Sequence, residues 1–440
     1  MEPVTVGIVS IVLLLIFIGL GFQIGLNFFL VGVISGTLII GLNRALILLG
    51  ESMYYTIASP TFASLPLFVL MGTFAVYGGF AKRAFEGIYA ATIGLPGSLG
   101  IATCYSCAAF GSVSGSSLAT AAVFGKIALP EMVRYKYNKS FALGCIASAG
   151  TFAAMIPPSI GFIVYAMFTD QSIGRLFAAG ILPGIITASV YSISIIYRIK
   201  KNPELAPVIA DGKEITIKQK IFALKKTGPI LTLSLIVLGG IYSGLFTPTE
   251  AAAAGAFATL IFGIRLGKLG KLEYFKESLR ESAQTTSMLF IIIVGAMFYS
   301  RVLSLTRLPM KLSMLLQEWN GPRIFILGAI FLIWFILGML MNPTSIQALT
   351  LPIIFPIVIR LGYDPIWFGV ITCKLGEIAA VTPPVGLNVY AIKGVAGKDT
   401  SIEEVFSGIW PFVVCDIIVL ILLVAFPQIV LFLPNLLLSH

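Results

Sequence analysis

Two Pro-Pro pairs inside apolar sequence are the residues best placed to do chemistry in this chain. Pro157-Pro158 and Pro383-Pro384 each interrupt a stretch that otherwise suits a helix. A proline removes a backbone donor and clashes with the preceding turn, so nearby carbonyls lose their helical partners. Where water is excluded, those carbonyls need protein groups, water or a bound cation. The two pairs therefore predict ligand-binding breaks in membrane helices.

Segments rich in hydroxyl and amide groups precede each pair and could supply further oxygens, which hard cations such as Na⁺ prefer. In the alternative interpretation, the small residues allow close helix packing and the prolines only kink the helices. The same combination of residues occurs twice in register, however, which favours ion binding. Half-helix N-termini would also attract an anionic group, so we expect a substrate between the two sites. The candidate Na⁺ ligands are Ser112, Ser114, Gly115, Ser116, Ser117, Pro157, Pro158 and Ser159, and then Asn342, Pro343, Thr344, Ser345, Thr382, Pro383 and Pro384.

Charged residues within the predicted spans are few, and intramembrane ions are costly. Lys374 and Glu377 lie one helical turn apart before the second break. Either they form a local ion pair at a water-facing surface, or Lys374 meets a substrate carboxylate; both interpretations stay open. Asp416 is assigned to packing or a subunit contact. Lys374, Glu377 and Asn388 are the candidate substrate-binding residues.

Enzymatic and metal chemistry is disfavoured by the residue types present. Cys104 and Cys107 form a CxxC, but no second pair accompanies them and the only histidine is His440. We interpret the cysteines as apolar packing residues. A membrane enzyme or proton pump would call for histidines or paired carboxylates within spans. We therefore expect no enzymatic activity and no organic cofactor.

The composition indicates a membrane protein. Of 440 residues, 58% are hydrophobic and only 11% are charged, whereas soluble domains carry about 25% charged residues. Residues 3–43 contain no Asp, Glu, Lys or Arg and are long enough for two spans, with a join near Gly19 to Gln23. Single crossings are predicted at 176–197, 227–249 and 417–439.

The N-terminus lacks the basic region of a cleaved signal peptide. The net charge of +10 comes without an aromatic-basic patch, so no nucleic acid partner is expected.

The chain contains an internal repeat. Shifting it by 226 residues superposes the two Pro-Pro pairs and gives nine identities over 127–158, Arg134 on Arg360 and Tyr137 on Tyr363 among them. We predict an all-α polytopic membrane protein built from two repeats. The first repeat (1–200) begins with scaffold spans at 4–80, which include an amphipathic stretch at 44–63. A re-entrant hairpin (96–129), a broken helix (138–168) and a last span (174–197) follow.

A basic linker, 201–228, leads to the second repeat (229–440). This repeat begins with scaffold spans at 229–300, which include an amphipathic stretch at 268–284, and continues with a hairpin (323–359), a broken helix (365–392) and a last span (405–432).

The two halves are predicted to have opposite orientations. If the hairpins do not cross, each half crosses five times, and an odd number inverts the second half. The positive-inside rule places the basic linker in the cytoplasm. Both chain termini then lie on the outer face.

At these motifs the chain resembles the large membrane subunit of tripartite ATP-independent periplasmic (TRAP) transporters. The matching segments cover nearly the whole chain and include GSVSGSSLATAA (111–122), IPPSIGFIVYA (156–166), FTPTEAAAAGAF (246–257) and TPPVGLNVY (382–390). The resemblance implies an elevator-type importer in a bacterial or archaeal cytoplasmic membrane, driven by a Na⁺ gradient without ATP. It also places the Na⁺ sites at the hairpin tips and their facing breaks.

The resemblance further implies partners and substrates. Such proteins work with a small four-span membrane subunit, here expected as a separate chain, and with a periplasmic substrate-binding protein. Their substrates are usually carboxylates. Two departures stand out: the position of Asn342 is often acidic in the family, and Arg134-Tyr135-Lys136 replaces a stretch that usually contains glycine. A stand-alone Na⁺-coupled carboxylate symporter is the alternative.

Overall fold

The computed structural model describes residues 2–207, 216–318, 321–397 and 399–438. Within these ranges the chain is helical and contains no strand, which confirms the all-α prediction. Seven of the described helices are long and apolar enough to cross a membrane, or eight if the bent pair Lys139–Met155 and Ile160–Thr169 is one span. Residues 208–215 of the predicted basic linker lie outside the described ranges.

The first half runs from paired apolar helices to a hairpin, a broken helix and a long last span. The predicted join at Gly19 to Gln23 is confirmed, because one helix ends at Gly19 and the next begins at Ile24. The helices are α1 (Pro3–Gly19), α2 (Ile24–Ile40), α3 (Leu42–Ala58), α4 (Ser64–Tyr77), α5 (Phe80–Thr92), α6 (Ser98–Ser114), α7 (Ser117–Arg134), α8 (Lys139–Ala149), α9 (Phe152–Met155), α10 (Ile160–Thr169) and α11 (Ile173–Lys201).

The second half follows the same order of hairpin, broken helix and last span. A π-helical segment, Leu235–Gly239, joins α13 to α14. The helices are α12 (Ile217–Leu224), α13 (Gly228–Ser234), α14 (Gly240–Tyr242), α15 (Pro248–Leu266), α16 (Leu272–Leu305), α17 (Leu308–Glu318), α18 (Arg323–Gly338), α19 (Pro343–Arg360), α20 (Pro365–Val381), α21 (Leu387–Ala396), α22 (Ile402–Ala425) and α23 (Gln428–Leu437). The opposite orientation of the two halves stays a prediction.

The third spans differ between the halves. In the first half, the helix before Ser59 and the span after it are separated at Pro60. In the second half, the predicted amphipathic stretch 268–284 and the span after it form one helix of 34 residues, α16. No proline occurs between Leu272 and Leu305, and an uninterrupted backbone ladder is the favoured state in an apolar solvent.

Two predicted crossings end earlier than expected. The prediction that 417–439 is a single crossing is wrong, because α22 ends at Ala425 and the chain turns at Phe426-Pro427 before α23. Proline at this point cannot continue the helical ladder. Helix α14 likewise ends at Tyr242, within the run 227–249.

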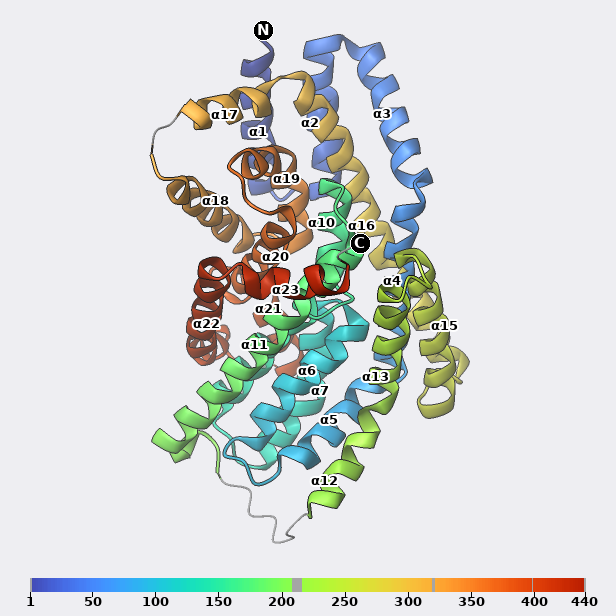
Figure 1. Cartoon of the computed structure of the whole chain (residues 1–440), viewed down its shortest axis with the longest axis vertical. Helices are drawn as coiled ribbons and strands as arrows, with labels where there is room; N and C mark the ends of the chain where they lie inside the picture. The colour runs from blue at the N-terminus through green and yellow to red at the C-terminus, as the bar shows by residue number, and fades with distance from the viewer. Residues whose placement is uncertain (1, 208–215, 319–320, 398, 439–440) are drawn as a thin grey trace.

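The broken helices of each half pack against the hairpin of the other half. In Figure 1, α6 and α7 lie below the centre of the view, α18 and α19 lie above it at the left, and α10 and α20 lie between them. The helix after each break packs on the hairpin of the other half: α10 on α19, and α21 on α7. The scaffold is defined here as α1 to α4 and α13 to α16, in which α2 packs on α16 and α4 on α15.

Candidate functional site

The first hairpin tip is a tight turn between two helices. Helix α6 ends at Ser114, and Gly115 adopts φ +62°, a left-handed conformation that favours glycine. The Ser116 hydroxyl oxygen then accepts a hydrogen bond from the Ala119 amide at 3.4 Å and caps α7. The sequence GSVSGSS therefore forms a turn at Gly115 and Ser116 between two helices; that these helices re-enter the membrane stays a prediction.

The first tip touches the first Pro-Pro break directly. The Gly115 carbonyl accepts a hydrogen bond from the Ile160 amide at 3.4 Å. A Cβ atom added at Gly115 would lie 2.9 Å from the Pro158 carbonyl oxygen, so the contact requires glycine. The Pro157-Pro158 peptide bond is cis. The structure thus brings together the predicted residues 115 and 158.

The second tip packs on α20, the helix that leads into the second break. The Asn342 side-chain oxygen accepts a hydrogen bond from the Ser345 amide at 2.8 Å and caps α19. Pro343 packs on the last turns of α20, where a Cβ atom added at Gly376 would lie 3.2 Å from Pro343 Cβ. The Pro383-Pro384 bond is also cis. Pro384 is exposed, whereas Thr382 is buried.

Several predicted ligands direct their hydroxyl hydrogens to protein carbonyls. Ser112 donates to Ala109 O at 2.6 Å, Ser159 to Ala154 O at 2.6 Å, and Thr382 to Ile378 O at 2.6 Å. Since a hydroxyl carries one donor and two lone pairs, each oxygen keeps acceptor capacity after donating. Ser159 Oγ already accepts a hydrogen bond from the Phe162 amide, and its second lone pair can coordinate a further group.

Four buried polar atoms around the second tip and break have no hydrogen-bond partner. They lie on α19, α20 and α21: Ser345 Oγ, Gln347 Oε1, Glu377 Oε2 and Asn388 Nδ2. Buried polar groups are normally satisfied, so each such atom needs an explanation, and an absent ion or ligand is one. Sequence reasoning missed Gln347, although an amide in an otherwise apolar helix was a visible signal.

Gln347 and Cys373 link the second tip to the first break. Gln347 Nε2 donates to Cys373 Sγ at 3.3 Å. A Cβ atom added at Gly161, just after the first break, would lie 3.4 Å from Cys373 Sγ. The two candidate sites are thus neighbours in the fold, although Pro158 and Gln347 are far apart in the sequence.

Glu377 reaches across to the first tip. Its Oε1 accepts a hydrogen bond from Ser117 Oγ at 3.3 Å, and its side chain is buried. The interpretation of Lys374 and Glu377 as a water-facing pair is wrong, because both residues are less than 4% exposed. Glu377 instead places a carboxyl group between the tip of one half and the broken helix of the other.

Lys374 is engaged within the protein. Its ammonium lies 2.5 Å from Asp416 Oδ1 and 3.4 Å from Thr187 Oγ1. The Tyr191 hydroxyl donates to Asp416 Oδ2 at 2.6 Å. Asp416, assigned from the sequence to packing or a subunit contact, is thus the ion partner of Lys374. A role for Lys374 toward a substrate carboxylate would require this pair to open.

A small cavity of about 50 Å³ lies beside the first tip. Ser114 and Ser116 line it from the hairpin, and Gly72, Glu281 and Thr285 line it from the scaffold helices. Among the described residues, no group of three or more His, Cys, Asp or Glu could hold a metal ion. The oxygens of this lining include the hydroxyls of Ser114, Ser116 and Thr285 and the carboxylate of Glu281, which are ligand types that hard cations prefer.

Solved structures with the same arrangement of helices are membrane transporters. The YdaH transporter of Alcanivorax borkumensis matches with a TM-score of 0.60 at 13% identity, covering 98% of this chain and 100% of that one. The MtrF protein of Neisseria gonorrhoeae, described as an antimetabolite efflux pump, matches with a TM-score of 0.57 at 14% identity, covering 97% and 95%. The fold with its paired helix breaks is that of an all-helical, multi-pass membrane protein.

The family follows from the sequence over nearly its full length. Residues 9–429 match the family described as "Tripartite ATP-independent periplasmic transporter, DctM component". This chain belongs to that family and is a TRAP transporter large permease. Its members are transporters, which confirms the expectation that the chain is not an enzyme.

Relatives with assigned substrates are similar over most of both chains. The C4-dicarboxylate TRAP transporter large permease of Pseudomonas aeruginosa is 35% identical, and the match covers 88% of this chain and 89% of the relative. The protein of the same name from Vibrio cholerae is also 35% identical, and the match covers 86% of each chain. A sialic acid TRAP large permease from Vibrio cholerae is 29% identical, covering 91% of both chains.

Proposed function

We propose that the chain imports a carboxylate by Na⁺-coupled symport, with the hairpins and broken helices moving as an elevator against the scaffold. The observation that carries the proposal is a pair of contacts: Gly115 of the first tip lies on Pro158 of its break, and Pro343 of the second tip lies on Gly376 of the helix that leads into its break. Paired discontinuous helices that meet near the centre of a membrane fold create sites for ions and for anionic substrate groups.

The ions are assigned to the two tips. The first site draws on the oxygens of 112–117 and of the facing break 157–159, and the second on 342–345 and 382–384. Asn342 contributes a neutral oxygen that already caps α19, so the unpartnered Ser345 Oγ and Gln347 Oε1 are proposed to supplement it. We assign Glu377 to the cation rather than to the substrate, because an ionised carboxylate attracts Na⁺ and repels a substrate carboxylate.

The substrate is placed between the two sites. Asn388 Nδ2 is a buried donor without a protein partner, the kind of group that orients a carboxylate in an otherwise apolar site. C4-dicarboxylates come first among test substrates, because relatives at 35% identity carry that name. Isethionate, ectoine and sialic acid follow, since other relatives are named for them.

Two contacts between hairpin and scaffold would change as the elevator moves. Ser112 Oγ lies 2.7 Å from Ser234 Oγ of α13. A Cβ atom added at Gly72 of α4 would lie 2.7 Å from the Ser114 carbonyl oxygen. A glycine at such a contact lets two backbones approach closely without interlocking side chains, which suits a surface that slides.

A tripartite system implies two further proteins. We propose a small four-span membrane subunit beside the scaffold and a periplasmic binding protein that delivers the substrate. The expected location is the cytoplasmic membrane, with the basic linker inside and both termini outside. In the alternative, a stand-alone symporter, the chain would transport free substrate.

Reconstituted uptake tests the proposal. Proteoliposomes containing this chain and its small subunit would take up labelled succinate only with both an inward Na⁺ gradient and the binding protein. Full uptake without the binding protein would favour the stand-alone symporter, and full uptake without Na⁺ would refute coupling. Ser116→Ala and Thr344→Ala should raise the Na⁺ concentration needed for half-maximal uptake, whereas Ser304→Ala on the exposed face of α16 should not.

A further inference from the structure

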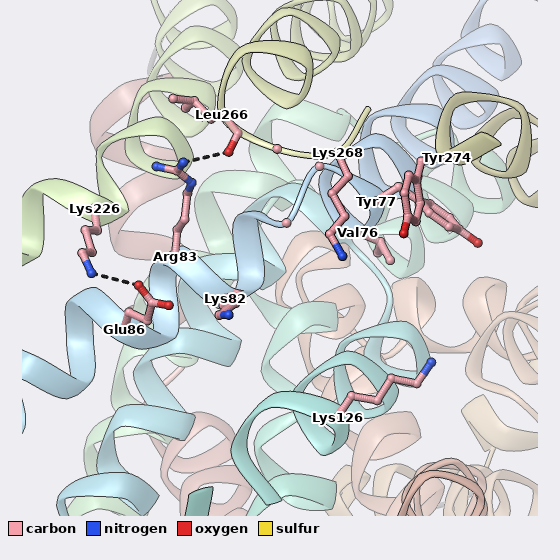
Figure 2. Close-up of a pocket in the computed structure, with 13 residues that line it drawn as sticks. Val76, Tyr77, Lys82, Arg83, Glu86, Lys126, Lys226, Leu266, Lys268 and Tyr274 are labelled. Atoms are coloured by element: carbon pink, nitrogen blue, oxygen red, sulfur yellow. Dashed lines mark hydrogen bonds and ion pairs between the residues drawn. The ribbon is translucent and has the colours of Figure 1, made fainter. Parts of the chain in front are cut away.

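A second, larger cavity lies beside the first hairpin and is lined by cations. Its volume is about 870 Å³, and Figure 2 shows the labelled side chains around it. The lining comes from the end of α4 and the turn after it, from α5, from α7 of the hairpin, and from the loop between α15 and α16 with the first turn of α16. Lys226, between α12 and α13, lies at the edge. The charged lining residues are Lys82, Arg83, Glu86, Lys126, Lys226 and Lys268.

Three of these charged groups are already engaged. Lys226 Nζ lies 2.8 Å from Glu86 Oε2, so the acidic side chain of the lining is neutralised. Arg83 Nη2 donates to Leu266 O at 2.7 Å. Lys82, Lys126 and Lys268 have no recorded ion pair among the described residues, and Lys268 lies 5.4 Å from the centre of the Tyr274 ring. The cavity therefore carries an excess of positive charge.

The scaffold wall of this cavity is held together by two loops in close contact. A Cβ atom added at Gly267 would lie 1.8 Å from the Gly78 carbonyl oxygen, so the loops at 78–79 and 266–268 touch through glycine. The hydrogen bond from Arg83 joins α5, which follows the first loop, to Leu266 of the second. Lys82 and Lys268 are thereby positioned on one wall before any ligand binds, which reduces the entropic cost of binding.

The hairpin wall connects the cavity to the first tip. Val76 lines both this cavity and the small one at Ser114 and Ser116. On α7, Ala119 lines the small cavity and Lys126 the large one. Seven residues separate them, which is about 10 Å along a helix. An anion leaving the tip region would therefore meet the three lysines next.

We propose that the cavity at Lys82, Lys126 and Lys268 is a second anion-binding site, which holds the carboxylate after it leaves the tip region. This inference rests on the proposed import of a carboxylate. Because the three lysines are exposed, binding is weak and falls as salt is added. Lipid phosphate has the same chemistry as a ligand, so the experiment separates the two anions.

Protection of a single thiol measures binding without transport. Tyr274→Cys places a thiol in the cavity and leaves all three lysines, while the native cysteines are buried. The full chain is placed in nanodiscs of phosphatidylcholine and treated with a maleimide. Succinate at four times its Kd should slow labelling about fivefold. Lys271→Cys, exposed at the start of α16 three residues before Tyr274 and outside the lining, is the matched control and should not be protected.

Variants that neutralise single lysines provide a second test by the same thiol protection. Each of Lys82→Gln, Lys126→Gln and Lys268→Gln should raise the succinate concentration for half protection about fivefold, the loss expected for one charge contact near water. The proposal is overturned if succinate does not protect the thiol, or if it protects Lys271→Cys equally. It is also overturned if protection occurs only with phosphatidylglycerol in the nanodisc, which would indicate a lipid headgroup.

The experiments distinguish failure of the proposed anion site from failure of the proposed Na⁺-coupled import. Protection requires neither Na⁺ nor the binding protein, whereas uptake requires both. Loss of protection with normal uptake in the wild type overturns the anion site alone. Protection without any Na⁺-driven uptake counts against the proposed coupling and leaves the anion site in place.

Discussion

The ammonium of Lys374 lies 2.5 Å from the carboxylate of Asp416, and both side chains are 1% exposed. The pair joins α20, the helix that leads into the second break, to the last span α22. Tyr191 and Thr187 of α11 complete the hydrogen bonding. This cluster holds the broken helix of the second half against the last spans of both halves, so it positions the second break.

Removing one partner of this pair should be strongly destabilising. Asp416→Ala leaves a buried ammonium without a counter-charge, a loss of about 3–5 kcal/mol. The double variant Lys374→Met/Asp416→Leu removes both charges, so its stability should be much closer to that of the wild type. Thermal unfolding in detergent measures both. Equal destabilisation by the single and double variants would contradict the assignment of the pair.

Glu377 should determine the apparent Na⁺ affinity. Glu377→Gln keeps the size of the side chain and removes the charge, so half-maximal uptake should need about tenfold more Na⁺. Succinate uptake against Na⁺ concentration gives this value. Glu51→Gln, at an exposed position of α3, is the control. An unchanged Na⁺ dependence in Glu377→Gln would remove Glu377 from the ion site.

Gly115 should be required for the contact between tip and break. Alanine in a left-handed conformation costs about 1–2 kcal/mol wherever it occurs. Gly21 also has a positive φ, +84°, but an added Cβ there would meet nothing within 4 Å. Both alanine variants should therefore lose similar backbone stability, but only Gly115→Ala should also lose uptake. Normal uptake by Gly115→Ala would mean that the contact with Pro158 is dispensable.

Gly72 should control the sliding of the first tip on the scaffold. An added methyl group would press on the Ser114 carbonyl at 2.7 Å. Gly72→Ala should slow maximal uptake about tenfold, a barrier increase of about 1.4 kcal/mol, with Na⁺ affinity little changed. Gly50→Ala, where α3 has open space, should be neutral or stabilising. The initial rate at saturating substrate and Na⁺ distinguishes the two variants, and equal rates would exclude a tight contact at Gly72.

The sequence by itself determined the membrane class, the order of elements and the places where the helices break. Apolar runs must be helical in a lipid solvent, and Pro157-Pro158 and Pro383-Pro384 cannot continue a helical ladder. These effects are local in sequence, so they could be predicted from one chain. The tips at Gly115 and Asn342 were predicted for the same reason, since turn residues at membrane depth have few other uses.

Only the tertiary structure decided which residues meet across the repeat. Asp416 as the partner of Lys374, Ser117 as the partner of Glu377, and Cys373 as the partner of Gln347 all depend on how α20 packs against helices far away in the sequence. The joining of Lys82, Lys126 and Lys268 around one cavity has the same origin. Side-chain pairing between distant helices follows from packing geometry, and neither composition nor spacing along one chain encodes it directly.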